Sequence, residues 1–216
     1  MNLAKLLQLA SPTLPVGAYS YSGGLEAAVE AGVVRDAASA ARWIGDVLEF
    51  SMARMEAPIV FSLLCGFSNE DSSGISTTNE MFLASRETAE LRAETVQMGY
   101  SLNLLLKNLG LGEVPLEEPS FPAAFACAAT QWKIDPGAAL QAYLWMWLEN
   151  QVMAAVKVVP LGQTDGQRIL LLLGDRLAGL VKEIARIKEE DTCNFTPALA
   201  LLSARHETQY SRLFRS

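Results

Sequence analysis

Histidine is nearly absent from this chain of 216 residues, which contains only His206. A structural zinc site needs four cysteine or histidine ligands close together, and a di-metal site on a helical bundle needs paired Glu-x-x-His motifs. Neither ligand set can be assembled, so the sequence predicts no resident metal and no other cofactor. A serine–histidine–aspartate triad would have to use His206, and no Gly-x-Ser-x-Gly motif is present to hold its nucleophile.

Glycine-rich nucleotide-binding motifs are missing as well. The sequence contains neither the GxxxxGK[ST] loop of nucleotide hydrolases nor a dinucleotide-binding fingerprint after a strand. A lone histidine near a terminus is more often a surface side chain than a catalytic base. We therefore predict that His206 lies at the surface and that the chain is not an enzyme. Two alternatives stay open: an all-helical enzyme built on His206 and nearby carboxylates, or a regulator that binds a small molecule.

Cysteine is scarce, and the three that occur are Cys65, Cys127 and Cys193. They are far apart in the sequence and form no Cys-x-x-Cys pair. An odd, scattered set of this kind is typical of reduced thiols in a reducing compartment. The first ten residues contain no apolar stretch long enough for a signal peptide. The sequence therefore predicts a cytoplasmic protein.

Long apolar runs without charges are also lacking. The most membrane-like segment, residues 138–159, contains Glu149 and Lys157. A membrane span needs about 20 apolar residues with few or no charges. We therefore expect a buried helix there and no membrane association.

Basic residues are outnumbered, because 17 lysines and arginines face 24 aspartates and glutamates and leave a net charge of −7. A chain of that sign repels phosphate backbones, so nucleic-acid binding is disfavoured. Apolar residues make up 50% of the chain and charged residues only 19%. This composition indicates either a large core or an apolar surface that a partner covers.

Helix signals recur along the whole chain, and strand signals hardly appear. Asp36 and Asp135 are good N-cap residues, and Pro58 is expected to kink or restart a helix. Segment 138–159 is apolar nearly all round, which is typical of a central helix. The sequence predicts one all-α domain over residues 1–216 with about eight to ten helices. The expected segments include 3–9, 25–31, 59–67, 123–132, 138–159, 163–188 and a last helix that starts at Thr196-Pro197.

The longest periodic pattern steps by four and three residues and predicts one long helix. Thr77 or Thr78 is a candidate for its N-cap, and the polar stretch 68–76 before it is predicted to be a surface loop. Arg86 and Glu90 are then spaced as an ion pair on a solvated helix face. The residues of the apolar pattern are Ala84, Thr88, Leu91, Thr95, Met98, Leu102, Leu105 and Leu109.

One candidate contact region is residues 15–22 with Glu26 at the start of the next helix, called here together the N-terminal segment. Two prolines and a glycine within residues 11–17 break any helix and fix a turn. The segment is either a tight loop between helices or a rigid contact surface. Its candidate contact residues are Pro15, Gly17, Tyr19, Ser20 and Glu26.

Three polar residues further along are additional candidates. Lys157 stands in an apolar helix, so either its stem lies along the core while its head reaches water, or it contacts a partner. Gln163 and Gln167 are one turn apart and share a face. They either hydrogen-bond across an interface or cap the helix after Pro160. Trp132, Trp145 and Trp147 are predicted to lie in the core.

The second candidate contact region is residues 205–216, called here the tail. Aromatic and arginine side chains are the usual anchors of interfaces, and the tail is rich in them. The alternatives are a solvated terminus or a segment docked on its own core. The candidate partner-binding residues are His206, Gln209, Tyr210, Arg212, Leu213, Phe214, Arg215 and Ser216.

Four stretches together resemble the UreF family of urease accessory proteins. They are LQLASPTLPVGAYSYSGGLE at 7–26, SRETAELRAE at 85–94, KVVPLGQTDGQ at 157–167 and HETQYSRLFRS at 206–216. They occur in the family's order along the whole chain. Ala18 and Gly23 depart from the residues usual in the family, which affects the local packing of the N-terminal segment.

The resemblance implies an all-helical homodimer without catalytic chemistry. It also implies an adaptor role in nickel insertion into apo-urease, in a complex with UreD (UreH in some organisms) and the GTPase UreG, which the adaptor modulates. On this resemblance the tail is assigned to UreD/UreH. The N-terminal segment, Lys157, Gln163 and Gln167 are assigned to UreG or to the dimer contact.

Overall fold

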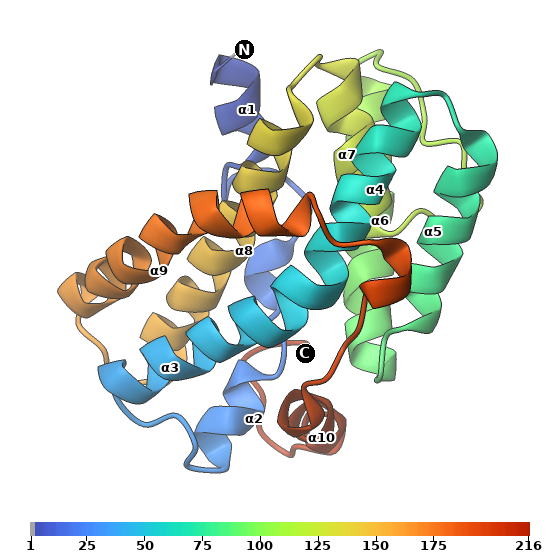
Figure 1. Ribbon diagram of the computed structural model, residues 1–216. Coiled ribbons are helices and arrows are strands. Elements are labelled where there is room, and N and C mark those ends of the chain that lie inside the picture. Colours follow the sequence, from blue (N-terminus) through green and yellow to red (C-terminus); the bar gives the residue numbers. More distant parts are fainter. Residues whose placement is uncertain (1–2) are drawn as a thin grey trace.

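The computed structural model describes residues 3–216, and this part of the chain forms helices and loops but no strand (Figure 1). The predicted all-α class is confirmed. The helices are α1 (Leu3–Leu9), α2 (Leu25–Glu30), α3 (Ala37–Val47), α4 (Ala57–Ser68), α5 (Ser72–Ala84), α6 (Ala89–Asn108), α7 (Phe121–Gln131), α8 (Pro136–Val158), α9 (Gln163–Ile184) and α10 (Pro197–His206). Three shorter or irregular elements are η1 (Ala18–Ser20), η2 (Leu48–Glu56) and η3 (Glu189–Asp191).

Several helices begin where side-chain capping dictates. The carboxylate of Asp36 accepts the N–H of Ser39, and the carboxylate of Asp135 accepts the N–H of Ala138. A cap of this kind satisfies a backbone donor that has no partner within the helix. Ser120 caps α7 in the same way. The predicted starts of α3 and α8 are therefore confirmed.

Helix α4 begins at Ala57 with Pro58 in its first turn, but Glu56 before it is also helical, so the chain does not restart there. The π-helical element η2 joins α3 to α4, so residues 37–68 form one continuous helical stretch. Among the described residues this is the one stretch long and apolar enough to cross a membrane by composition. Half of its most apolar window is buried inside the protein, and a core helix has the same composition.

The single long helix predicted before residue 109 is wrong, and so is the surface loop predicted over residues 68–76. Helix α5 begins at Ser72, where the carboxylate of Asp71 accepts the N–H of Gly74. The chain then leaves the helical path at residues 85–88 and restarts as α6, with the Thr88 hydroxyl accepting the N–H of Leu91. The apolar spacing continues across this break, so periodicity alone could not reveal it.

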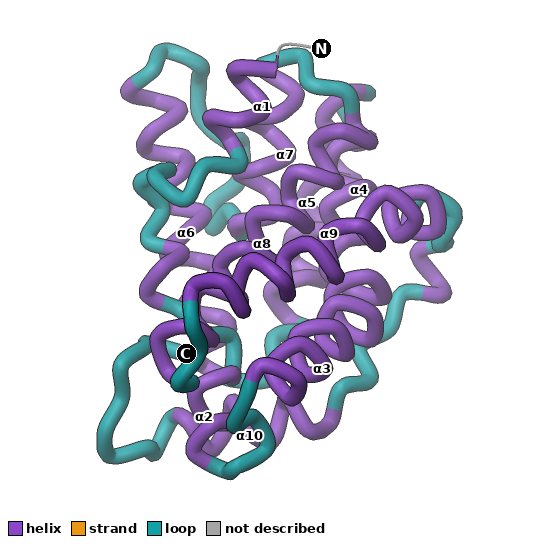
Figure 2. Tube along the Cα trace, turned by 90° about the vertical axis from the view of Figure 1, so that its left-hand side faces the viewer, coloured by secondary structure: helices purple, strands orange, loops and turns teal. Residues whose placement is uncertain are grey.

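Helices α7 and α8 form the centre of the molecule (Figures 1 and 2). Helix α7 packs against α4 and α6, and α8 packs against α9 and α4. Every residue from Phe121 to Ala129 is buried. The ring centroids of Phe125 and Tyr143 are 4.9 Å apart in an edge-on arrangement, which fixes α7 against α8. The predicted central position of α8 is confirmed.

Helix α10 packs against α2, and the chain then turns back toward the N-terminal segment. The C-terminus lies beside α2 and α10 in both views (Figures 1 and 2). The fold therefore brings the two candidate contact regions together, although nearly 180 residues separate them.

Candidate functional site

The tail is bound along the N-terminal segment by backbone hydrogen bonds. The N–H of Arg215 donates to the carbonyl of Ser20 over 2.8 Å. The N–H of Ser22 donates to the carbonyl of Ser216 over 3.1 Å, and the Ser22 hydroxyl donates to the same oxygen over 2.5 Å. Of the open alternatives for the tail, the structure shows a segment docked on its own chain. The two candidate regions form one site.

Glu26 is the central acceptor of this site. Its carboxylate lies in the first turn of α2, is buried, and accepts the N–H groups of Leu213 over 2.7 Å and Phe214 over 2.9 Å. Gly24 precedes the helix with a φ of 83°, a left-handed conformation that glycine adopts without strain. This turn aims α2 so that Glu26 faces the tail and not the solvent.

His206 is fully buried, so the prediction of a surface histidine is wrong. Its Nε2 lies 3.2 Å from Oε2 of Glu26, and its Nδ1 lies 2.6 Å from Oε2 of Glu90. Glu90 also accepts Nη1 of Arg212 over 2.6 Å. These partners come from α2, α6 and the tail, and no local sequence pattern connects them.

Phe214 packs into the protein beside α8. Its side chain is buried, and Nζ of Lys157 lies 5.4 Å from the centroid of its ring. Lys157 itself is exposed, which is compatible with both of the arrangements predicted for it. The ammonium group over the ring face adds a cation–π attraction that holds the tail against α8.

Ser216 connects the end of the tail to the interior. Its hydroxyl donates to Oε2 of Glu94 over 2.7 Å. Burial raises the pKa of the Glu94 carboxyl to about 7, and the bond from Ser216 partly opposes that rise. The negative charge of Glu56 raises it further. Glu94 therefore changes its charge near neutral pH at the point where the chain ends.

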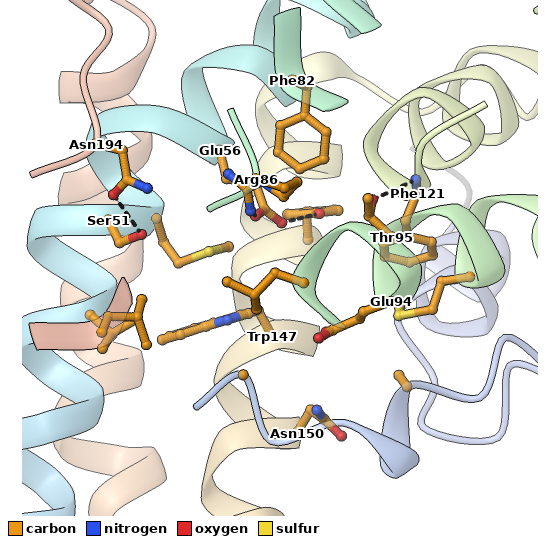
Figure 3. A pocket seen from close by; sticks show the side chains of 18 of the residues that line it. Ser51, Glu56, Phe82, Arg86, Glu94, Thr95, Phe121, Trp147, Asn150 and Asn194 are labelled. Carbon is orange, nitrogen blue, oxygen red and sulfur yellow. Dashed lines mark hydrogen bonds and ion pairs between the residues drawn. The ribbon is translucent and has the colours of Figure 1, made fainter. Parts of the chain in front are cut away.

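Glu94 also lines a partly open pocket of about 100 Å³ (Figure 3). Opposite it, Arg86 pairs with Glu56 over 3.1 Å, and the hydroxyl of Tyr143 donates to Glu56 over 2.6 Å. Apolar and aromatic side chains line the rest of the pocket wall, among them Phe82, Met98, Phe121, Met146 and Trp147.

Beside the pocket, Arg86, Glu56 and Tyr143 form a connected network that holds their segments of the chain together. The guanidinium of Arg86 lies 4.2 Å from the ring centroid of Phe82 and bonds to Glu56. Burial and the neighbouring Glu56 raise the pKa of Tyr143 well above its usual value, so the phenol stays protonated and donates a hydrogen bond to Glu56. Among the described residues, no group of three or more histidine, cysteine or acidic side chains is arranged to hold a metal ion.

Other tail side chains point outward. The Gln209 amide donates to the carbonyl of Ser211 over 2.9 Å, which shapes a turn. Tyr210 within that turn is fully exposed, and Leu213 after it is 63% exposed. We call four exposed side chains of the tail, together with the exposed Tyr19 and Lys157 that line a pocket beside Phe214, the tail surface. Its members are Tyr19, Lys157, Tyr210, Arg212, Leu213 and Arg215.

The remaining predicted residues lie in the N-terminal segment and on α9. Pro15 is exposed, and Gly17 takes a φ of 80° where η1 begins, so both shape the loop that carries Tyr19. Gln163 and Gln167 are exposed at the start of α9, away from the tail. They do not cap the helix, whose N-cap is Gly162.

Gln167 instead lines a groove between α1, α8 and α9, which has a volume of about 680 Å³. Trp145 lies in this groove and is 37% exposed, so its predicted place in the core is wrong. The Trp145 ring packs against Gly174 of α9, and the rest of it is open to the groove. Leu7 and Leu171 stand on the groove as exposed apolar side chains, and Leu171 is 69% exposed.

A polar row on α6 contacts the tail. Glu90, Glu94 and Gln97 all face the tail, and Gln97 accepts from the hydroxyl of Tyr21 and lies 3.5 Å from Nη1 of Arg215. Their spacing of four and three residues puts them on one helix face, which was the available signal. The expected pair of Arg86 with Glu90 is wrong, because Arg86 lies before the helix and reaches Glu56.

Comparison with known proteins gives one consistent family. Residues 34–174 match the family model UreF. The urease accessory protein UreF of Azoarcus sp. (strain BH72) is 59% identical over 225 residues, covering 100% of this chain and 96% of that protein. The protein of the same name from Dechloromonas aromatica (strain RCB) is 54% identical, covering 100% of this chain and 98% of that protein. That of Janthinobacterium sp. (strain Marseille) is 48% identical over nearly the same extent.

Proposed function

The chain belongs to the UreF family of urease accessory proteins, and from that premise we propose that it is a non-catalytic adaptor for the insertion of nickel into apo-urease. In this role it bridges UreD, called UreH in some organisms, and the GTPase UreG, and it modulates the GTPase. It acts in the cytoplasm as a homodimer, and each copy is a single domain of residues 1–216 with the tail as its contact for UreD/UreH.

The single observation that carries the proposal is the exposure of Tyr210 and Leu213 on a segment whose two ends are buried. His206 fixes one end of the segment, and Phe214 fixes the other. A recognition segment that is already ordered loses less conformational entropy on binding than a free one. Exposed aromatic and aliphatic side chains on such a segment are suited to bind another protein.

The charge of the tail surface supports a protein partner with an acidic contact region. Arg212, Arg215 and Lys157 are exposed there, although the whole chain carries a net charge of −7. Complementary charges speed encounter and fix the orientation of partners. We assign Tyr210, Arg212, Leu213 and Arg215 to direct contact with UreD/UreH, while the buried tail residues hold these side chains in place.

Tyr19 and Lys157 lie on the side of the tail surface formed by the N-terminal segment and α8. Both line a shallow pocket beside Phe214. We assign this side to UreG. The assignment depends on the same docked tail, because Phe214 forms one wall of that pocket.

Replacing Tyr210 by alanine together with Leu213 by aspartate tests the assignment of the tail. We expect the affinity for purified UreD to fall about 100-fold or more, because the loss of one interface anchor often costs 2 kcal/mol or more. Helix content is expected to stay unchanged, since both side chains are exposed. Isothermal titration calorimetry and circular dichroism measure the two quantities.

The matched control is Leu172→Asp, which places the same charge at an equally exposed leucine of α9, outside the tail surface. This variant is expected to bind UreD like the parent chain. Unchanged affinity of the Tyr210/Leu213 double variant, with its fold intact, would remove the tail from the interface and with it the observation on which the proposal depends.

A second copy of the chain is proposed to cover the groove between α1, α8 and α9. Its apolar wall contains Trp145, and the exposed Leu7 and Leu171 stand beside it. A two-fold interface needs a surface that is complementary to itself. A groove next to a projecting apolar side chain meets this need, because each copy can seat its leucine in the groove of the other.

We expect Leu171→Asp to convert the dimer to a monomer, because it places a charge in the covered groove. Analytical ultracentrifugation at micromolar concentration measures the change. Leu172→Asp serves again as the control, since Leu172 is outside the groove, and it should remain dimeric. A Leu171→Asp chain that sediments as a dimer would show that the groove is not the interface.

A further inference from the structure

The partly open pocket beside Glu94, called here the Glu94 pocket, lies where several parts of the chain meet. Residues of η2, α6, α8 and the N-terminal segment line it (Figure 3). Its volume is about 100 Å³. A cavity of about 150 Å³ accepts benzene, which has six heavy atoms, so this pocket has room for about four heavy atoms of an entering group.

The charged side chains that line the Glu94 pocket are mainly acidic. They are the carboxylates of Glu56, Glu87 and Glu94 and the guanidinium of Arg86. Arg86 is already engaged, because its Nη1 bonds to Glu56 over 3.1 Å and its Nη2 bonds to the hydroxyl of Ser85 over 3.3 Å. The lining therefore carries an excess of negative charge, and a cleft lined by one sign of charge attracts the opposite sign.

Glu94 is the carboxylate of this lining that lacks a counter-ion. Its Oε2 accepts the hydroxyl of Ser216 over 2.7 Å, but within residues 3–216 no basic side chain forms an ion pair with it. Burial raises its pKa to about 7, and neither the Ser216 bond nor the charge of Arg86 offsets that rise. A carboxylate in such a place is stabilised by a cation that comes within reach.

The surroundings of Glu94 suit an ammonium group. Figure 3 shows its carboxylate pointing into the pocket, which Asn150 and Trp147 of α8 also line. The Nδ2 of Asn150 donates to the carbonyl of Tyr21 over 3.1 Å, so its Oδ1 remains as an acceptor. An ammonium has three donors, and a cation close to an indole face gains a cation–π attraction.

The rest of the pocket suits a short, unbranched alkyl stem. Met52 of η2, Met98 of α6 and Met146 of α8 line it from three sides of the chain. Methionine side chains are flexible and adapt to apolar groups of different shape. A guanidinium head alone has four heavy atoms and would place polar atoms against these methionines. A metal ion would find no histidine or cysteine in the lining.

We propose that the Glu94 pocket is a binding site for a primary alkylammonium group, with its nitrogen against Glu94 and its stem among the methionines. A free small amine and the end of a lysine side chain of a partner protein share this chemistry. The site goes beyond the proposed contact with UreD/UreH, because neither Tyr210 nor Leu213 lines the pocket.

Nuclear magnetic resonance of methionine methyl groups in the full chain tests the site, with n-propylamine and 1-propanol as probes. Both probes have four heavy atoms, and only the amine is charged at about pH 8, where Glu94 is mostly ionised. We expect the signals of Met98 and Met146 to shift, and propylamine to bind about tenfold or more tightly than propanol, since hydrogen bonds between charged groups are the stronger ones. Equal affinities, or no shift with propylamine, would overturn the proposal.

Glu94→Gln removes the charge and keeps an oxygen to accept the Ser216 hydroxyl. We expect its affinity for propylamine to fall about tenfold, to the affinity for propanol, while propanol binding stays unchanged and shows that the pocket is intact. Glu87→Gln is the matched control, because Glu87 lines the same pocket but is exposed. Its loss is expected to stay below about threefold, since solvent screens an exposed charge. An equal loss in both variants would overturn a site at Glu94, and so would a Glu94→Gln chain that binds propylamine like the parent.

The source of the ammonium group is determined with Nα-acetyl-lysine methylamide, which carries the lysine side chain on a peptide backbone. If it binds as tightly as propylamine, the site takes a lysine of a partner protein. If it binds about tenfold more weakly, the backbone does not fit at the opening and the site takes a free amine. Either result supports the site.

The double variant of Tyr210 and Leu213 separates this site from the proposed function. It is expected to bind propylamine like the parent chain, because both residues lie outside the pocket. Failure of propylamine to bind the parent would therefore reject the ammonium site alone. Unchanged UreD affinity of the double variant would reject the tail contact alone.

Discussion

Replacing Gly99 by alanine is expected to lower the free energy of unfolding by roughly 3–5 kcal/mol, which is at the high end for a single substitution. A Cβ at this position would lie 2.1 Å from the carbonyl oxygen of Pro119 and 2.7 Å from the carbonyl carbon of Ser120. Both are backbone atoms, so no rotation of a side chain can relieve the contact.

The loop before α7 has no freedom to withdraw from Gly99. The Asn79 amide oxygen accepts the N–H of Ser120 over 2.9 Å, and the Asn79 amide nitrogen donates to the carbonyl of Glu118 over 3.0 Å. The hydroxyl of Thr95 accepts the N–H of Phe121. Moving the loop would break these buried hydrogen bonds, each of which costs about 1–3 kcal/mol when its partner is lost.

Denaturant unfolding followed by circular dichroism measures the effect. Gly179→Ala is the matched control, because it is also a helical glycine, and a Cβ there meets no atom within 4 Å. It is expected to stabilise the protein by about 0.5–1 kcal/mol through helix propensity. If the Gly99→Ala and Gly179→Ala variants had the same free energy of unfolding, the close packing of α6 on the start of α7 would not depend on a glycine at position 99.

The parts of the fold that could be predicted are those that depend on neighbours in the sequence. The N-caps Asp36 and Asp135 act on backbone groups three residues away, so their chemistry is visible in a short window. The apolar character of α8 predicts its central place for the same reason. A helix that is apolar on all sides is buried in the core whichever helices pack against it.

The break at residues 85–88 shows why other parts could not be predicted. The apolar steps from Ala84 to Leu91 are compatible with one helix, and nothing within that window opposes it. The break lets Arg86 reach Glu56, thirty residues earlier in the chain, while Thr88 caps the restarted helix. A tertiary ion pair and a local cap together override the periodic pattern.

The sequence names residues of the candidate site, but it does not predict how they are arranged. Of the three tail anchors that the sequence predicts to be uncovered, Tyr210 and Leu213 are exposed, whereas Phe214 is buried. His206 was expected at the surface because no partner adjoins it in the sequence. Its carboxylates lie 116 and 180 residues away, so burial of this histidine follows only from the return of the tail to α2.

Replacing Arg86 by methionine is expected to lower the free energy of unfolding by roughly 3–5 kcal/mol, because it leaves a buried carboxylate without its counter-ion. The side chains of Arg86 and Glu56 are only 11% and 17% exposed. Tyr143 would still donate to Glu56, but one neutral donor does not replace a guanidinium. Denaturant unfolding at neutral pH gives the magnitude.

The double variant Arg86→Met/Glu56→Gln separates the lost charge pair from lost packing. A glutamine oxygen still accepts from Tyr143 and carries no charge, so we expect this chain to recover most of the stability that the single variant loses. Arg92→Met is the control, since Arg92 pairs with Glu118 on the surface with both side chains more than 40% exposed. Its cost is expected to stay below about 1 kcal/mol. Should Arg86→Met lower the free energy of unfolding as little as Arg92→Met does, the buried ion pair of Arg86 with Glu56 would not be what stabilises this region.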